Sequence, residues 1–172
     1  MQILKTLALG GMILVCVALP GMAQVLTMFQ PKNQRDRDRL RRSFNGLQGQ
    51  KYLKIYQRGG RDVVEVTEGG KKKILEYKLN ELKIKPSKSW DKKWRVVMFD
   101  IPERKRRARN ALSRVLKEIG LVQLQKSVFI APYECRNEID FIANYFRVRD
   151  CVNYLEVTQV DHEVRLKQLF YL

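Results

Sequence analysis

The sequence predicts an α+β protein in two parts, with helices and a β-hairpin in the first half and alternating strands and helices in the second. Two observations lead to this prediction. Apolar residues between Trp94 and Val160 follow strand and helix periods in turn, and Gly59 and Gly60 separate two short alternating runs. A hydrophobic content of 45% in 172 residues is sufficient for packed cores.

Positive charge dominates the composition, because the chain has 34 Lys and Arg residues and only 18 Asp and Glu residues, which gives a net charge of +16. An excess of this size indicates a polyanionic partner, and double-stranded DNA is the first candidate. Cys16, Cys135 and Cys151 are too few and too scattered for a disulfide framework, and His162 as the single histidine excludes zinc-finger spacing. We therefore expect a cytoplasmic protein with reduced cysteines and assign His162 no role.

The first 31 residues contain one charge, Lys5, whereas the remainder contains 33 basic residues. Residues 1–23 match a secretory signal peptide in their single lysine, apolar run and small residue at Ala23. The alternative is a buried helix over Ile3–Val17 and a second short helix after Pro20, beneath a DNA-binding module. We favour the buried helices. The apolar run is shorter than the ~20 residues that cross a bilayer, so we expect no stable membrane insertion.

A basic helix is predicted over Gln34–Gly49, where Leu40, Phe44 and Leu47 form a narrow apolar stripe. Its other faces carry arginines, which contact phosphates and base edges when a helix lies in the major groove. The same pattern is typical of a solvated helix face. The candidate DNA-binding residues here are Arg35 and Arg37, chosen for base contact near the helix start, with Arg39, Arg41 and Arg42.

Two alternating runs, Tyr52–Tyr56 and Asp62–Thr67, flank the Gly-Gly pair and predict a β-hairpin. Two helices, a basic helix and a hairpin with a basic tip form the layout of a winged helix-turn-helix. Arg58 and Arg61 at the tip are expected to contact DNA backbone. The segment VTEGGKKK, Val66–Lys73, resembles segments that close the wing in winged-helix regulators.

A helix over Lys71–Leu82 is predicted to follow, and then a charged segment broken by Pro86. We place the domain boundary in that segment. The expected organisation is a winged-helix domain over 1–82, a linker over 83–93 and a second domain over 94–172.

The second domain is predicted to begin with a buried strand over Trp94–Ile101, followed by a helix from Pro102 with an apolar face and a strongly basic face. Gly120 is the expected C-cap of this helix. The later elements are strands over Leu121–Leu124 and Ser127–Ala131, a helix over Glu134–Phe146 and a strand over Cys151–Val160. The order βαββαβ is the ferredoxin-like arrangement. On the basic helix, Arg104, Arg106 and Arg107 join the candidate DNA-binding residues.

The stretch WDKKWRVVMFDIPERKRRARNALSRVLKEIGLVQLQKSVFIAPYECRNEIDFIANYF, Trp90–Phe146, resembles the middle domain of PaaX-type transcriptional repressors. That domain is itself similar to the small CRISPR adaptation protein, here called Cas-two. FDIPE, the basic helix and QKSVFIAPY carry the resemblance. It implies a DNA-binding repressor that forms a homodimer through the ferredoxin-like domain. Trp94, Val96 and Met98 share the strand face on which we expect the second subunit.

Asp100 gives the alternative hypothesis, because Cas-two proteins carry at this strand end the aspartate associated with metal-dependent phosphodiester cleavage. The resemblance then implies a Mg²⁺-dependent nuclease or a CRISPR adaptation protein with an added nucleic-acid-binding module. In a dimer, one Asp100 from each subunit would bind the metal. An aspartate before proline is also typical of a helix cap, as is Glu103. A repressor requires a winged helix and Cas-two does not, so we favour the regulator, which needs no cofactor.

Overall fold

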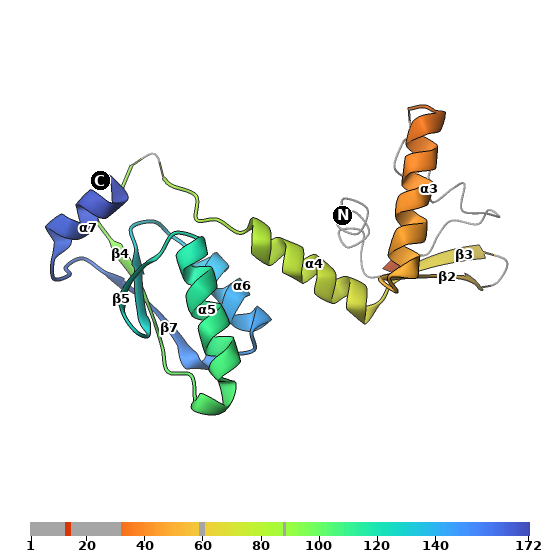
Figure 1. The fold of residues 1–172 in the computed structure, drawn as a ribbon. Coiled ribbons are helices and arrows are strands. Elements are labelled where there is room, and N and C mark those ends of the chain that lie inside the picture. The colour runs from red at the N-terminus through yellow and green to blue at the C-terminus, as the bar shows by residue number, and fades with distance from the viewer. Residues whose placement is uncertain (1–12, 15–31, 59–60, 88) are drawn as a thin grey trace. The chain divides into compact units, whose positions relative to one another are not determined.

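The computed structural model describes residues 13–14, 32–58, 61–87 and 89–172, and the chain divides into two compact units, Met1–Asn80 and Glu81–Leu172 (Figure 1). The described elements of the first half are β1 (Ile13–Leu14), α3 (Gln34–Gly49), β2 (Leu53–Arg58), β3 (Arg61–Val66) and α4 (Glu68–Glu81). Those of the second half are β4 (Trp94–Phe99), η1 (Glu103–Lys105), α5 (Arg106–Glu118), β5 (Val122–Gln125), β6 (Val128–Ala131), α6 (Arg136–Tyr145), η2 (Arg149–Cys151), β7 (Val152–Val157) and α7 (Glu163–Phe170).

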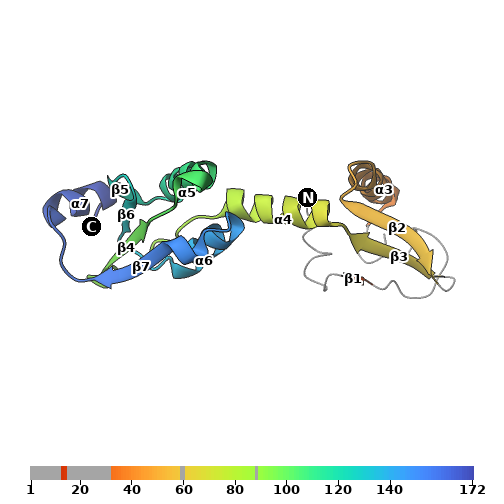
Figure 2. The same cartoon turned by 90° about the horizontal axis from the view of Figure 1, so that it is seen from below.

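The first unit contains a three-stranded antiparallel sheet in the order β1-β3-β2. β2 and β3 form the expected hairpin, with Arg58 opposite Arg61 at its tip. Figure 2 shows α3 nearly end-on beside β2, with β3 and β1 following in turn. The hairpin was predictable because Leu53, Val64 and Val66, which are buried, are spaced two residues apart or flanked by polar residues, with Val63 as a further buried residue of β3.

The N-terminal prediction is wrong at two residues, because Ile13 and Leu14 form a strand rather than part of a helix. They pair with Glu65 and Val64 of β3, so this edge of β3 is hydrogen-bonded to another strand. The rest of the expected helix, the helix after Pro20 and the signal-peptide interpretation lie outside the described residues. Among the described residues, no helix has the length and apolar character needed to cross a membrane.

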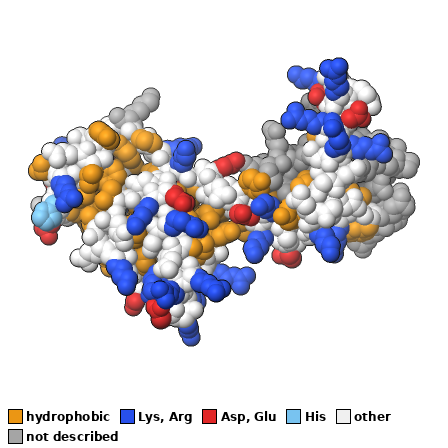
Figure 3. All heavy atoms as spheres, in the orientation of Figure 1, with side chains coloured by type: hydrophobic (Ala, Val, Ile, Leu, Met, Phe, Trp, Pro, Cys, Tyr) orange, Lys and Arg blue, Asp and Glu red, His pale blue; other side chains and the backbone are white. Residues whose placement is uncertain are grey.

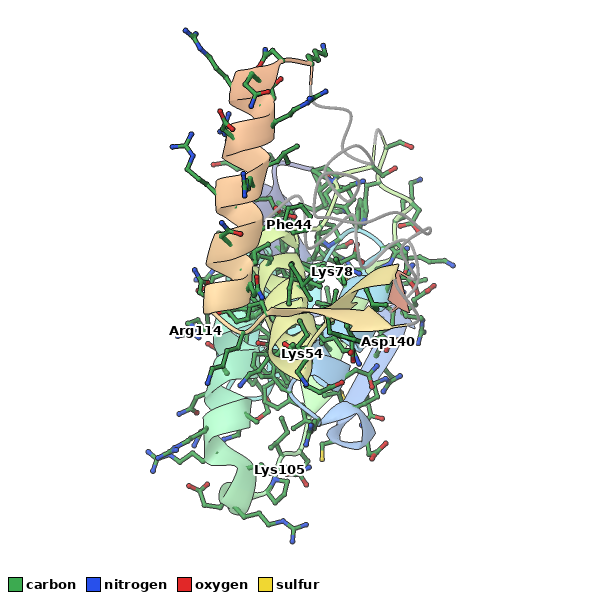
Figure 4. The ribbon with its side chains drawn as sticks, turned by 90° about the vertical axis from the view of Figure 1, so that its right-hand side faces the viewer. Phe44, Lys54, Lys78, Lys105, Arg114 and Asp140 are labelled. Carbon is green, nitrogen blue, oxygen red and sulfur yellow. The ribbon has the colours of Figure 1, made fainter. Side chains whose placement is uncertain are left out.

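Helix α3 has the predicted bounds. Its N-cap is Asn33, whose side-chain oxygen accepts a hydrogen bond from the Asp36 N–H at 2.8 Å. Phe44 and Leu47 are buried at its C-terminal half (Phe44 is labelled in Figure 4), whereas the residues of its first half are exposed or half-buried. The helix is therefore anchored at one end and solvent-facing at the other.

Helix α4 begins earlier than expected, which corrects the interpretation of Val66–Lys73 as the closing segment of the wing. Only Val66 belongs to β3, and the helix starts at Glu68. Thr67 caps the N-terminus of the helix, because its Oγ1 accepts a hydrogen bond from the Gly70 N–H at 3.1 Å. The same Oγ1 donates to the Lys51 carbonyl at 2.6 Å. Gly70 is required there, since a Cβ atom would lie 2.2 Å from the Tyr52 carbonyl oxygen.

The second unit confirms the ferredoxin-like prediction. Its four strands follow the order β5-β6-β4-β7, and all neighbouring strands are antiparallel. The two helices of the βαββαβ order, α5 and α6, contact each other. Val97 and Phe99 of β4 are buried on one sheet face, and Phe99 stacks on Phe129 of β6 at 5.9 Å between ring centroids.

The opposite sheet face is partly covered by α7, which the sequence interpretation missed. Leu166 of α7 packs with Trp94 and Ile130, so Trp94 is fully buried rather than part of an open face as predicted. Met98, on the same strand face, remains 40% exposed. His162 precedes α7 as its N-cap residue with a left-handed φ of 59°. The open part of this face is therefore smaller than expected.

Candidate nucleic-acid interface

Helix α3 brings the predicted arginines of the first unit onto one solvent-facing element. Figure 3 shows Lys and Arg side chains gathered over this helix. Arg42 Nε donates to the Asp38 carbonyl at 3.4 Å, and Asp36 and Asp38 are the acidic residues of the helix. Within the described part of the chain, no α3 arginine forms an ion pair. The exposed arginines are Arg35, Arg37, Arg39, Arg41 and Arg42.

These arginines divide by helical spacing into neighbouring sets. Arg35, Arg39 and Arg42 follow one another at four and three residues, which places them on one face of the helix. Arg37 and Arg41 are four residues apart on a second face. Because the buried anchors Phe44 and Leu47 lie further along the chain, the first two turns offer positive charge on more than one side.

The hairpin tip carries the next predicted pair. Arg58 ends β2 and Arg61 begins β3, and their Cα atoms are register partners. Gly59 and Gly60, predicted as the turn, lie outside the described residues. The backbone thus brings Arg58 and Arg61 to one end of the hairpin.

On the second unit, Arg104, Arg106 and Arg107 lie on η1 and the first turn of α5 and are exposed. Glu103 was expected to cap this helix, but it forms ion pairs instead, at 2.9 Å to Arg109 Nη2 and 3.7 Å to Arg106 Nε. The three predicted arginines are therefore not equivalent. Of the three, Arg106 is the one that has an acidic partner among the described residues.

Asp100 lies exposed at the end of β4, where its backbone N–H donates to the Cys151 carbonyl at 3.0 Å. Its carboxylate forms no hydrogen bond with any described residue, so the expected cap is not formed. The described residues also contain no group of three His, Cys, Asp or Glu side chains arranged for a metal ion. Mg²⁺ usually takes one or two carboxylates together with waters, and Asp100 is not part of any such group of three among the described residues.

Sequence reasoning missed a buried arginine that fastens the linker to the second unit. Arg95 of β4 is 5% exposed, and its Nη1 and Nη2 donate to the Asp91 carboxylate at 2.7 and 2.6 Å. Nη1 also donates to the carbonyls of Lys93 and Pro132. Nε lies 3.5 Å from Glu134 Oε2 without forming a hydrogen bond. The hydrogen bond from Arg95 lowers the pKa of Asp91 from 3.8 to about 2.

Trp90 attaches the same segment to α7. Its ring lies 4.9 Å from that of Trp94, and its Nε1 donates to the Lys93 carbonyl at 3.0 Å. The Lys167 ammonium lies 5.2 Å from the centre of the Trp90 ring. Asp91 and Trp90 therefore hold the last residues of the predicted linker against the second unit. The spacing of four residues between Asp91 and Arg95 gave no signal, because such a spacing brings side chains together on a helix and Arg95 lies on a strand.

Cys135 confirms the interpretation of a described cysteine as a buried apolar residue. Its side chain is fully buried, and this burial raises the pKa of the thiol to about 12. The Tyr154 hydroxyl accepts from the Cys135 N–H at 3.4 Å and donates to Glu134 Oε1 at 3.2 Å. A thiol in this state is protonated at neutral pH and unsuited to catalysis.

Residues 87–168 match the model of the PaaX protein central Cas2-like domain, which covers just under half of the chain and nearly all of the second unit. No curated protein matches the chain.

Proposed function

We propose that this chain is a transcriptional regulator that binds double-stranded DNA through α3 and dimerises through its second unit, because residues 87–168 match the model of the PaaX protein central Cas2-like domain. The observation that carries the proposal is the solvent-facing arginine-rich helix α3 directly before the β2–β3 hairpin. The action would be repression in the cytoplasm, without a metal or other cofactor.

The topology of the first unit supports a winged helix-turn-helix. In this motif a recognition helix is followed by a two-stranded wing, which corresponds here to α3, β2 and β3. The short strand β1 pairs with β3 and widens the hairpin into a small sheet. Helix α3 contacts β2 of this sheet.

The anchoring of α3 supports insertion into DNA. A helix of 16 residues is about 24 Å long, and the major groove is about 12 Å wide. Phe44 and Leu47 hold only the C-terminal half, so the N-terminal half is free to enter the groove. Arg35 and Arg37 in that half are the proposed base contacts, and Arg39, Arg41, Arg42, Arg58 and Arg61 are proposed to contact phosphates.

Binding of DNA by α3 is tested with Arg37→Ala in the full chain, against the control Arg165→Ala on the exposed surface of α7. Loss of a bidentate arginine–guanine contact costs ~1–3 kcal/mol, or roughly 5- to 150-fold in affinity at one base position. We expect Arg37→Ala to weaken binding to the specific site and to change binding to scrambled DNA much less. Equal, small losses for both variants on both DNAs would show that α3 is only a solvated basic helix.

The open part of the second sheet supports a homodimer. Met98 and Leu155 are each 40% exposed, and half-buried Val96 pairs with Leu155 and half-buried Val128 pairs with Met98 across the strands. A contiguous apolar face of this kind is typical of a protein interface. A two-fold dimer uses the same surface patch on both subunits, so this apolar face of one subunit would be covered by the apolar face of the other.

Light scattering of Leu155→Glu tests the dimer, with Val164→Glu on the 72%-exposed position of α7 as the matched control. We expect a dimer for the wild type and the control at micromolar concentration, and a monomer for Leu155→Glu, because two buried carboxylates would face each other. A monomeric wild type would contradict the proposal.

The nuclease alternative is not favoured by the described donors. Among the described residues, Asp100 does not belong to any group of three His, Cys, Asp or Glu side chains that could hold a metal ion. Any cleavage activity would depend on a partner subunit or on substrate oxygens. We therefore keep Asp100 outside the proposed machinery.

A further inference from the structure

Helix α5 has a second basic surface, formed by residues that lie along its outward side. Leu112, Val115 and Leu116 are buried on its inner side. The outward positions follow one another at three, four and three residues, which aligns them along ~15 Å of helix. All four outward residues are exposed: Arg107, Asn110, Arg114 and Lys117. We call them the α5 stripe.

The charges of the α5 stripe are mostly unpaired. Arg107 and Lys117 have no acidic partner in the described part of the chain, and exposed Arg104 one turn earlier has none either. Arg114, labelled in Figure 4, lies 3.8 Å from Glu118, but both side chains are largely exposed and the pair is screened by solvent. Figure 3 shows Lys and Arg side chains gathered where α5 begins.

Helix stability does not account for this distribution. The N-terminus of a helix carries a partial positive charge, so cations in the first turn are unfavourable. Within α5, Arg114 and Lys117 are like-charge neighbours three residues apart, which also destabilises a helix. An anionic partner is the simplest compensation for this concentration of positive charge.

We propose that the α5 stripe is a second DNA-binding surface, which contacts the phosphate backbone without reading sequence. The inference rests on the proposed function, because it takes the same duplex DNA as its partner. The apolar side of α5 is packed against the core, so only its outward side is available to DNA, and this side presents a single row of long polar and basic side chains. Guanidinium and amide groups in a row match phosphate oxygens, which accept most protein–DNA hydrogen bonds.

The test compares the full-length double variant Arg107→Ala/Lys117→Ala with the charge-matched control Lys126→Ala/Arg165→Ala. The control residues are exposed on the β5–β6 turn and on α7. Binding to the specific site and to scrambled duplex is measured at several salt concentrations. Two lost phosphate contacts should reduce the slope of log affinity against log salt by about 1.8 per protomer, with a loss of roughly tenfold or more at 0.1 M salt.

The expected result is the same loss on both DNAs for the α5 variant and a smaller one for the control, with no decrease in the melting temperature of either. The charge-retaining variant Arg107→Lys/Lys117→Arg should bind almost as the wild type does. Equal salt slopes for the α5 variant and the control would overturn the proposal. If Arg37→Ala still loses specificity in that case, the proposed role of α3 stands. A changed salt slope for the α5 variant without any effect of Arg37→Ala would instead support the α5 stripe and contradict DNA binding by α3.

Discussion

The two basic helices differ in how they are held, and this difference separates their roles. In α3, the buried residues are Phe44 and Leu47, both in the C-terminal half, so arginines occupy several sides of a projecting end. In α5, Leu112, Val115 and Leu116 bury a continuous side, and the exposed basic residues lie away from that side. In the proposed roles, a similar content of arginine therefore serves groove binding by α3 and phosphate-backbone binding by α5.

The largest expected effect tests whether the helices belong to independent units. Phe44 and Leu112 are both fully buried, and substitution by alanine should cost about 3–5 kcal/mol for Phe44 and about 2–5 kcal/mol for Leu112. Trp90 and Trp94, the two tryptophans of the chain, lie in the second unit. Denaturation followed by tryptophan fluorescence therefore reports on the second unit, and circular dichroism reports on both.

For Phe44→Ala we expect an earlier transition by circular dichroism and an unchanged transition by fluorescence. For Leu112→Ala the fluorescence transition should move. If Phe44→Ala shifts the fluorescence transition as much as Leu112→Ala does, the two units unfold together, and the helices cannot be treated separately.

A smaller effect distinguishes an unpaired arginine from a paired one. Arg35 on α3 has no acidic partner among the described residues, whereas Arg106 on α5 is held 3.7 Å from Glu103. Arg35→Ala should lose ~1–3 kcal/mol of binding free energy at one base position, and Arg106→Ala less than about 1 kcal/mol on any DNA. Titrations with the specific site and with single-base variants measure both. A larger loss for Arg106→Ala would reverse the assigned roles.

The bounds of α3 and the order of elements in the second unit could be predicted from the sequence. The bounds of α3 were predicted because Pro31 and Asn33 precede it and its apolar stripe ends at Leu47. The βαββαβ order was predicted because each period change coincides with Pro102, Gly120 or a polar turn. In both cases the signal lies within the element itself.

Features that depend on distant contacts were not predictable in this way. Trp94 was predicted to lie on an exposed sheet face because α7, the helix that buries it, is about 70 residues later in the chain. The apolar residues Leu166 and Phe170 were too few to predict that helix from its period. Arg95 looked like an interruption of a strand because its neutralisation by Asp91 requires the linker to fold back. Asp100 remained ambiguous because a strand-end carboxylate is compatible with a cap and with a metal ligand.

The smallest expected effect concerns buried Arg95, which is paired with Asp91. The exposed arginines of α3, in contrast, form no ion pair among the described residues. The folded-state pKa of Asp91, about 2, lies below its ordinary value of 3.8, so its contribution to stability is complete above about pH 4 and is lost as the pH falls through 2. Asp91 is half-exposed and screened by solvent, so we expect at most about 1 kcal/mol. Fluorescence-monitored denaturation of wild type and Asp91→Asn should differ at pH 6 and converge near pH 2. A constant difference would mean that Asp91 does not act through its charge.

The central claim, that α3 makes this chain a sequence-specific DNA-binding protein, is tested most directly by selecting bound duplexes from a random DNA pool with the full-length chain. Mg²⁺ is present, and the bound DNA is examined for cleavage. We predict enrichment of one palindromic sequence, because a two-fold dimer presents two copies of α3, and intact DNA. Absence of any enriched sequence, or cleavage that Asp100→Ala abolishes, would contradict the claim.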